Sequence, residues 1–201
     1  MPIIRIKYNR FLDPIFKAYI KSNQKWKDWV EPTETEVKER VKKYKEEWAK
    51  YEKKIIEGIC EALGLNFSQN IIDVHIVSGN DRQFSNPVVI KSGLKPDEFI
   101  ESLSHELIHR LFSDNVQNVV AGKIFLEMFP DENELARNHI ITHAVLKFIY
   151  LDVLKEKERL AKNIERSSKS SFPEYPRAWK IVEEKGYREL INYFKERCNK
   201  K

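Results

Sequence analysis

Residues 99–112 read FIESLSHELIHRLF, and this stretch holds two of the five histidines of the chain, His105 and His109. Apolar residues recur through it at the spacing of a single helix face: Ile100, Leu103, Leu107 and Leu111. Pro96 and the two acids after it favour a helix start, because proline fits a first helical turn and acids are stabilised beside the positive end of a helix. The pattern therefore predicts a helix over 96–112 with one face packed against a hydrophobic core.

His105 and His109 are four residues apart, so on a helix they stand one turn apart on the same face. Two imidazoles placed in this way can hold one tetrahedral zinc ion. Glu106 lies about 100° round the helix from His105 and can take a proton from zinc-bound water, as in the H-E-x-x-H pattern. The alternative interpretation is three ordinary polar residues on the wet face of a helix. Burial beside a core is costly for such residues without a partner, which favours the metal site.

A catalytic zinc needs a third protein ligand. Glu134 begins a predicted helix in the sequence NELARN, and Asn138 lies one turn further along. A carboxylate at Glu134 can bind the metal while Asn138 hydrogen-bonds a histidine ring from behind. His139 or His143 can replace Glu134 and give an all-histidine site. The helical wheel puts His143 nearly opposite Glu134, so these two do not serve together.

The two segments His105–His109 and Asn133–Asn138 resemble the motifs of the gluzincins, the thermolysin-like zinc metallopeptidases among the zincins. That group carries H-E-x-x-H on one helix and the ligand glutamate of N-E-x-x-x-D on the next. The resemblance implies that His105, His109 and Glu134 bind Zn²⁺. It also implies that Glu106 is the general base and then the proton shuttle of a peptidase acting on peptides or proteins. Asn138 stands where the group usually has Asp.

The short spacing is also similar to minimal single-domain gluzincins and to ImmA/IrrE-type metallopeptidases. The resemblance implies an α+β fold, mostly α and zincin-like, with a small twisted sheet that has an edge strand. A long backing helix, an active-site helix, a glutamate helix and an extra C-terminal helix complete the expected layout. In such enzymes the edge strand binds extended substrate by β-augmentation, and PVVIK (87–91) is the candidate.

Local patterns place these elements along the chain. Thr33 and Glu36 form a capping-box pattern that predicts one helix from there to about Leu63. Apolar residues recur along it at spacings of three and four, which predicts one face packed in the core: Val37, Val41, Tyr44, Trp48, Tyr51, Ile55, Ile59 and Leu63. Alternating or β-branched segments predict strands within 3–8, at 71–77 and at 87–91. Further helices are expected over 115–129, from 131 to about 166, and after a loop at 167–176, with a possible break at Gly186.

The whole chain is expected to be one zincin-like domain, 1–201. Its catalytic core is placed at about 33–166, and its C-terminal helical extension at about 167–201. No linker or internal repeat divides the sequence.

Composition fits a globular protein, with 41% hydrophobic and 33% charged residues. No apolar run approaches the roughly 18 residues that a membrane span needs. The two cysteines are too few for a disulfide framework, so a reducing cytoplasm is expected. The abundance of Lys, Glu and Ile is typical of thermophile proteins.

The net charge of +5 is mild and spread along the chain, which indicates a solvated surface, and a face for nucleic acid or an acidic partner is the less favoured alternative. The alternative function is a catalytically silent or latent member of the fold, acting as a regulatory or binding module for protein or nucleic acid. In a latent form, the loop at 167–176 or the last helix would cover the cleft.

Overall fold

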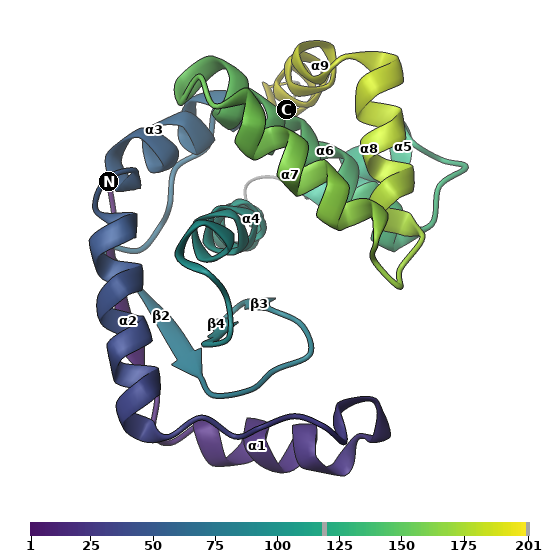
Figure 1. Cartoon of the computed structure of the whole chain (residues 1–201). Helices are drawn as coiled ribbons and strands as arrows, with labels where there is room; N and C mark the ends of the chain where they lie inside the picture. Colours follow the sequence, from purple (N-terminus) through teal and green to yellow (C-terminus); the bar gives the residue numbers. More distant parts are fainter. Residues whose placement is uncertain (118–119, 200–201) are drawn as a thin grey trace. The chain divides into compact units, whose positions relative to one another are not determined.

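The computed structural model describes residues 1–117 and 120–199 (Figure 1). Over these residues the chain is α+β and mostly helical, with one small mixed sheet of four strands. Its contacts group it into two compact units. Unit 1 is formed by residues 1–53 and 69–110, and unit 2 by residues 54–68 with the described residues from Leu111 onward. The sequence predicted one domain over 1–201, of which residues 118–119 and 200–201 lie outside the described part.

The sheet belongs to unit 1 and has the order β1-β2-β4-β3. Its strands are β1 (Ile3–Tyr8), β2 (Ile71–Val77), β3 (Phe84–Ser85) and β4 (Val88–Lys91). β1, β2 and β4 are parallel, and β3 is antiparallel to β4. The three predicted strands are thus confirmed. Alternation sets the two faces of β1, because Ile4 and Ile6 are buried while Arg5 faces Asp73 of β2 in register, with an ion pair of 2.5 Å.

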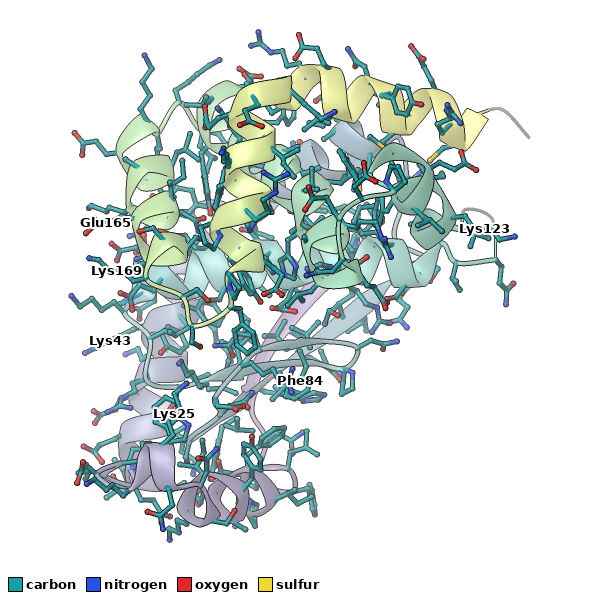
Figure 2. All side chains as sticks on the ribbon, turned by 90° about the vertical axis from the view of Figure 1, so that its right-hand side faces the viewer. Lys25, Lys43, Phe84, Lys123, Glu165 and Lys169 are labelled. Carbon is teal, nitrogen blue, oxygen red and sulfur yellow. The ribbon has the colours of Figure 1, made fainter. Side chains whose placement is uncertain are left out.

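The prediction that PVVIK (87–91) forms the sheet edge is wrong. β4 lies between β2 and β3, so the two-residue strand β3 is the edge. β2 and β4 run in the same direction, so the chain between them must turn back, and part of this returning segment pairs with β4 as β3. Phe84 of β3 is 40% exposed and packs beside Phe16, with ring centroids 5.9 Å apart (Figure 2).

Three helices complete unit 1 around this sheet: α1 (Asp13–Ser22), α2 (Glu34–Trp48) and the N-terminal part of α4 (Pro96–Asp114), with a short 3₁₀ turn, η1, at Gln24–Trp26. The capping box of Thr33 and Glu36 forms as predicted. α2 packs on β1 and β2, and its Tyr44 ring stacks on Phe99 of α4 at 4.2 Å. α1 was not predicted. Pro14 after Asp13 fits a first helical turn, but only Asp13 and Ile20 of this helix are buried, so no wide apolar face marks it.

The single helix predicted from Thr33 to Leu63 is two helices, α2 and α3 (Glu52–Leu63). α2 ends in a tightened turn, in which the amide of Lys50 donates to Glu47 O and that of Tyr51 to Trp48 O. The apolar periodicity still predicted the core correctly. All its members are buried except Tyr51, which lies at the break: Val37, Val41, Tyr44, Trp48, Ile55, Ile59 and Leu63.

Unit 2 is helical. Besides α3 it contains α5 (Ala121–Met128), α6 (Glu134–Phe148), the π-helix η2 (Ile149–Val153), α7 (Lys157–Ser168), α8 (Glu174–Lys185) and α9 (Tyr187–Asn199). α8 and α9 both pack on α6. Phe112, Phe125 and Phe194 form an aromatic cluster with centroids 5.3–5.7 Å apart. The ion pair of Glu165 and Lys169 lies on the exposed side of α7 (Figure 2).

The long helix predicted from 131 to about 166 is interrupted. α6 continues into the π-helix, and Lys155 then takes a positive φ of 61° before α7 begins. No glycine or proline stands at this break, so the local sequence could not predict it. The break predicted at Gly186 is confirmed, because this glycine has φ 81° and separates α8 from α9.

Asp13 is a buried carboxylate that ties α1 to the end of β2. Its oxygens accept from the Tyr8 hydroxyl at 2.6 Å, from the Ser78 amide at 2.5 Å and from the Ser78 hydroxyl at 2.9 Å, and Lys17 Nζ lies at 2.9 Å. Burial opposes ionisation of Asp13, but these donors outweigh it and hold the pKa of the carboxyl below its ordinary value.

We expect Asp13→Asn to lower the free energy of unfolding at pH 7 by about 2–3 kcal/mol, because an amide cannot accept from all these donors. Chemical denaturation measures this, with exposed Asp28→Asn as the control. Since the folded-state pKa is depressed, the contribution is complete above the ordinary pKa of 3.8 and is lost as pH falls through the folded value. The free energies of unfolding of the wild type and Asp13→Asn should therefore converge as pH falls into the acid range. Equal stability at pH 7 would contradict the role given to Asp13.

Candidate metal centre

α4 carries the H-E-x-x-H segment. At its N-terminus the Glu98 carboxylate accepts from the Lys95 amide at 3.0 Å, and Pro96 is its first residue. Its predicted apolar face is fully buried, with 0% exposure at each position: Ile100, Leu103, Leu107 and Leu111. This burial fixes the rotation of the helix about its axis and so determines where the polar residues between these positions point.

His105 and His109 are brought together as the sequence predicted. Their Nε2 atoms lie 3.1 Å apart, and the ring centroids lie 4.8 Å apart with 60° between the planes. Both side chains are half-buried. At this distance one Nε2 donates and the other accepts, so the two imidazole edges converge on nearly the same point in space.

Glu106 is buried, with 8% exposure. No described residue forms a hydrogen bond or ion pair with its carboxyl group. Burial raises the pKa of this carboxyl from its ordinary value to about 8, so it carries a proton at neutral pH when no metal ion is present. A buried acid without a partner is unfavourable for stability, and such groups are concentrated at functional sites.

α6 in unit 2 carries His139, which is 5% exposed. The Nδ1 of His139 lies 2.7 Å from Leu135 O, and because a carbonyl only accepts, Nδ1 carries the ring proton. Burial lowers the pKa of His139, although the Leu135 carbonyl and the Glu174 carboxylate oppose this. The ring is therefore neutral at pH 7 with its lone pair on Nε2, which is the form that binds metal.

Aromatic side chains of α8 pack on the histidines of α6. His143 is 1% exposed and stacks on Trp179 at 4.4 Å and 14°, while the Tyr175 ring lies 4.3 Å from that of His139. The sequence placed Tyr175 in a loop, but it lies in the first turn of α8. The Pro-Glu pair at 173–174 was the available signal for that helix start.

Glu134 and Asn138 lie on α6 near its start. Glu134 is the first residue of the helix and is exposed, after Asn133 caps it by accepting from the Ala136 amide at 2.9 Å. Asn138 is half-buried, and its side chain forms no hydrogen bond with another described residue. The roles given to Glu134 and Asn138 as metal ligand and supporting residue remain predictions.

Comparison of the chain with protein-family models, curated proteins and solved structures gives no match. Over the residues described, no helix combines the length and the apolar character that crossing a membrane requires.

We expect Glu106→Gln to raise the free energy of unfolding of the metal-free protein by about 1–3 kcal/mol at pH 7. The folded-state pKa of Glu106 is raised, so the wild type loses stability as pH rises from about 4.5 towards 8, and a glutamine does not. Denaturation in the presence of a chelator measures the difference, which should vanish below about pH 4. A destabilised variant at pH 7 would contradict the unpartnered state of this carboxyl.

Proposed function

We propose that the chain is a zinc-dependent peptidase in which His105 and His109 bind the ion and Glu106 is the general base. One observation carries the proposal: two convergent imidazoles stand on the same helix as a buried carboxyl group with which no other described residue forms a hydrogen bond or ion pair. The similarity of the segment His105–His109 to the H-E-x-x-H motif of the gluzincins supports the same reaction.

The donor set fits zinc. Two nitrogens at about 2.05 Å from a tetrahedral ion lie about 3.3 Å apart. The Nε2 atoms of His105 and His109 are 3.1 Å apart, so a shift of a few tenths of an ångström is sufficient. Neutral imidazole suits zinc among the common metal ions. A divalent cation nearby would also lower the pKa of Glu106 and give it the ionised form that a base requires.

For the third ligand we propose His139. Its Nδ1–H is held by a backbone carbonyl, which is the usual support of a metal-binding imidazole. With His105 and His109 it would supply the three imidazole nitrogens of an all-histidine zinc site. Glu134, which the sequence favoured, lies on the surface of unit 2. His139 was the alternative that the sequence left open.

In peptide hydrolysis the ion would polarise the scissile carbonyl and a water molecule. Glu106 would accept the proton of that water as it attacks and then deliver it to the leaving amine. Burial suits this role, because a desolvated carboxylate is a stronger base than one in water. Tyr175 lies beside His139 and would contact the ligand ring directly.

Metal content tests the ligand set. After purification and dialysis against zinc, elemental analysis should give about one zinc per chain. We expect His105→Ala, His109→Ala and His139→Ala each to lower zinc affinity by more than about a hundredfold, since even a supporting residue is worth 10–100-fold.

His75→Ala is the matched control, because His75 lies on β2 and pairs with Asn9. Glu134→Gln distinguishes the two candidate third ligands. Loss of zinc in Glu134→Gln but not in His139→Ala would overturn the choice of His139. If the wild type binds no zinc, the proposal of a zinc site is overturned.

Activity tests the reaction. A library of quenched fluorescent peptides should reveal zinc-dependent cleavage that a chelator abolishes. Glu106→Gln should lower the cleavage rate by about 10²–10⁴-fold while zinc stays bound. Bound zinc with no cleavage of any peptide would instead support the alternative, a silent or latent member of the fold that acts as a binding module.

A further inference from the structure

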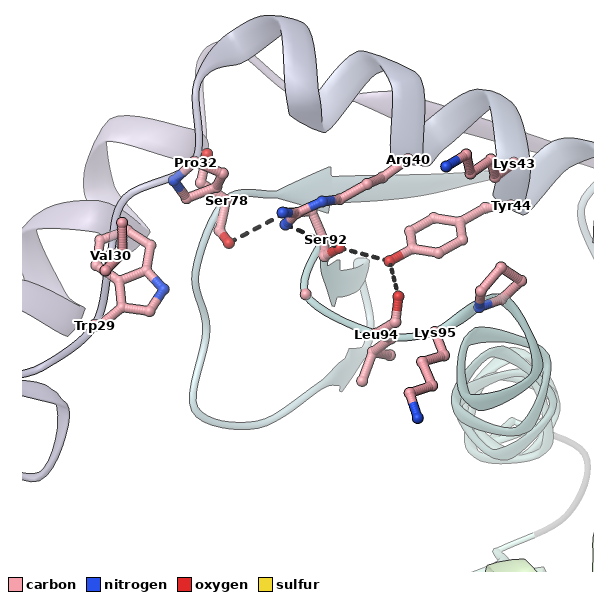
Figure 3. Close-up of a pocket in the computed structure, with 12 residues that line it drawn as sticks. Trp29, Val30, Pro32, Arg40, Lys43, Tyr44, Ser78, Ser92, Leu94 and Lys95 are labelled. Atoms are coloured by element: carbon pink, nitrogen blue, oxygen red, sulfur yellow. Dashed lines mark hydrogen bonds between the residues drawn. The ribbon is translucent and has the colours of Figure 1, made fainter.

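Unit 1 contains a cavity of about 430 Å³ that is separate from the histidines of α4. Its walls come from the segment before α2, from α2 itself, from the end of β2 and from the connection between β4 and α4. Figure 3 shows Arg40 in the middle, with Trp29, Val30 and Pro32 on one side and Lys43, Tyr44 and Lys95 on the other. The volume lies within the range of small-molecule sites, about 300–1,000 Å³.

The lining is cationic. Arg40, Lys43 and Lys95 contribute positive charge, and none of the residues that line the cavity is acidic. Within the described residues, no carboxylate forms an ion pair with any of these three cations. The nearby acid Glu98 is engaged with the Lys95 amide at the start of α4. A concave site with one sign of charge concentrates ligands of the opposite sign.

The floor is polar and fixed. The Tyr44 hydroxyl lies 2.6 Å from Ser92 O and 2.7 Å from Leu94 O, and the Ser92 hydroxyl donates to Ser78 O at 3.2 Å. In the described chain, the guanidinium of Arg40 makes only one hydrogen bond, a long one of 3.5 Å to Ser92 O. The remaining N–H donors of its planar fork can therefore bind a ligand, and this fork matches phosphate oxygens.

One wall is aromatic. The ring of Trp29 lies against Gly79 so closely that a Cβ at this glycine would meet a ring carbon at 2.7 Å. The absence of a side chain at Gly79 therefore gives Trp29 its position. Buried Pro32 adds further apolar surface. Trp29 thus offers a flat face on which a planar ring can stack.

We propose that this cavity binds a small phosphate ester that carries a planar ring, of the nucleoside monophosphate class. The phosphate pairs with Arg40 and the two lysines, and the ring packs on Trp29. All the residues concerned belong to unit 1. The inference is independent of the metal centre, because neither His105 nor His109 contributes to the cavity.

Titration with adenosine monophosphate tests the proposal, with adenosine and inorganic phosphate as separate arms. Calorimetry and tryptophan fluorescence should both report binding of the monophosphate, and added salt should weaken it. We expect adenosine and inorganic phosphate each to bind at least about tenfold more weakly, because each lacks one of the two groups that the cavity contacts.

Two matched pairs of variants locate the binding. Arg40→Gln should weaken it by about tenfold or more, while Lys42→Gln removes one charge from the same helix outside the cavity and should leave it unchanged. Gly93→Leu should block the cavity without harming the fold, because a Cβ at Gly93 meets nothing within 4 Å. Gly122→Leu is its control, since Gly122 is equally open and lies in unit 2.

Equal affinity for adenosine and its monophosphate, or unchanged binding by Arg40→Gln and Gly93→Leu, would overturn the proposal. Inorganic phosphate binding as tightly as the monophosphate would overturn the role of Trp29. Two charged hydrogen bonds should give a dissociation constant below about 10 mM. If neither phosphate compound binds at that concentration, the whole proposal is overturned.

Discussion

The burial of one face of α4 is the constraint on which the candidate metal centre depends. Four apolar side chains at full burial fix how the helix is turned, so the residues between them have no freedom in where they point. His105 and His109 then share an edge, and Glu106 is drawn under the surface with them. The unfavourable position of this carboxyl follows from the packing of its neighbours, and it lowers the stability of the metal-free protein at neutral pH.

Much of the fold could be predicted from local sequence. β1, β2 and β4 were visible as alternating or β-branched runs, and the burial of α4 followed from the spacing of its apolar residues. The break after α2 could not be predicted, because the apolar stripe continues across Tyr51. The break within 131–166 could not be predicted either, because Lys155 adopts a left-handed backbone conformation that is unusual for lysine. α1 was not predicted either, because only two of its residues are buried and its sequence shows no wide apolar face. The strand β3 is held by pairing with β4 rather than by its own two residues.

The candidate sites divide in the same way. The pair His105 and His109 could be predicted because its geometry depends on one helix alone. The third ligand could not, because helix spacing cannot decide between Glu134 and His139. The structure adds only their burial: the side chain of Glu134 is exposed, and that of His139 is held inside unit 2. The cavity beside Arg40 was invisible to sequence reasoning, because four separate segments build it and none carries a recognisable motif.

The discontinuous course of unit 1 has a consequence for how the chain folds. β1 pairs with β2 across nearly seventy residues, from Ile3 to Ile71, and α4 comes last of all the elements of this unit. Closing so long a loop before any sheet contact forms is entropically unfavourable and slows folding. Until α4 forms, Tyr44 of α2 lacks the Phe99 ring on which it stacks. Partly assembled units that expose apolar surface associate readily with one another. Refolding should therefore be most efficient in dilute solution. The helix that carries His105 and His109 is the last element to cover the apolar surface of unit 1.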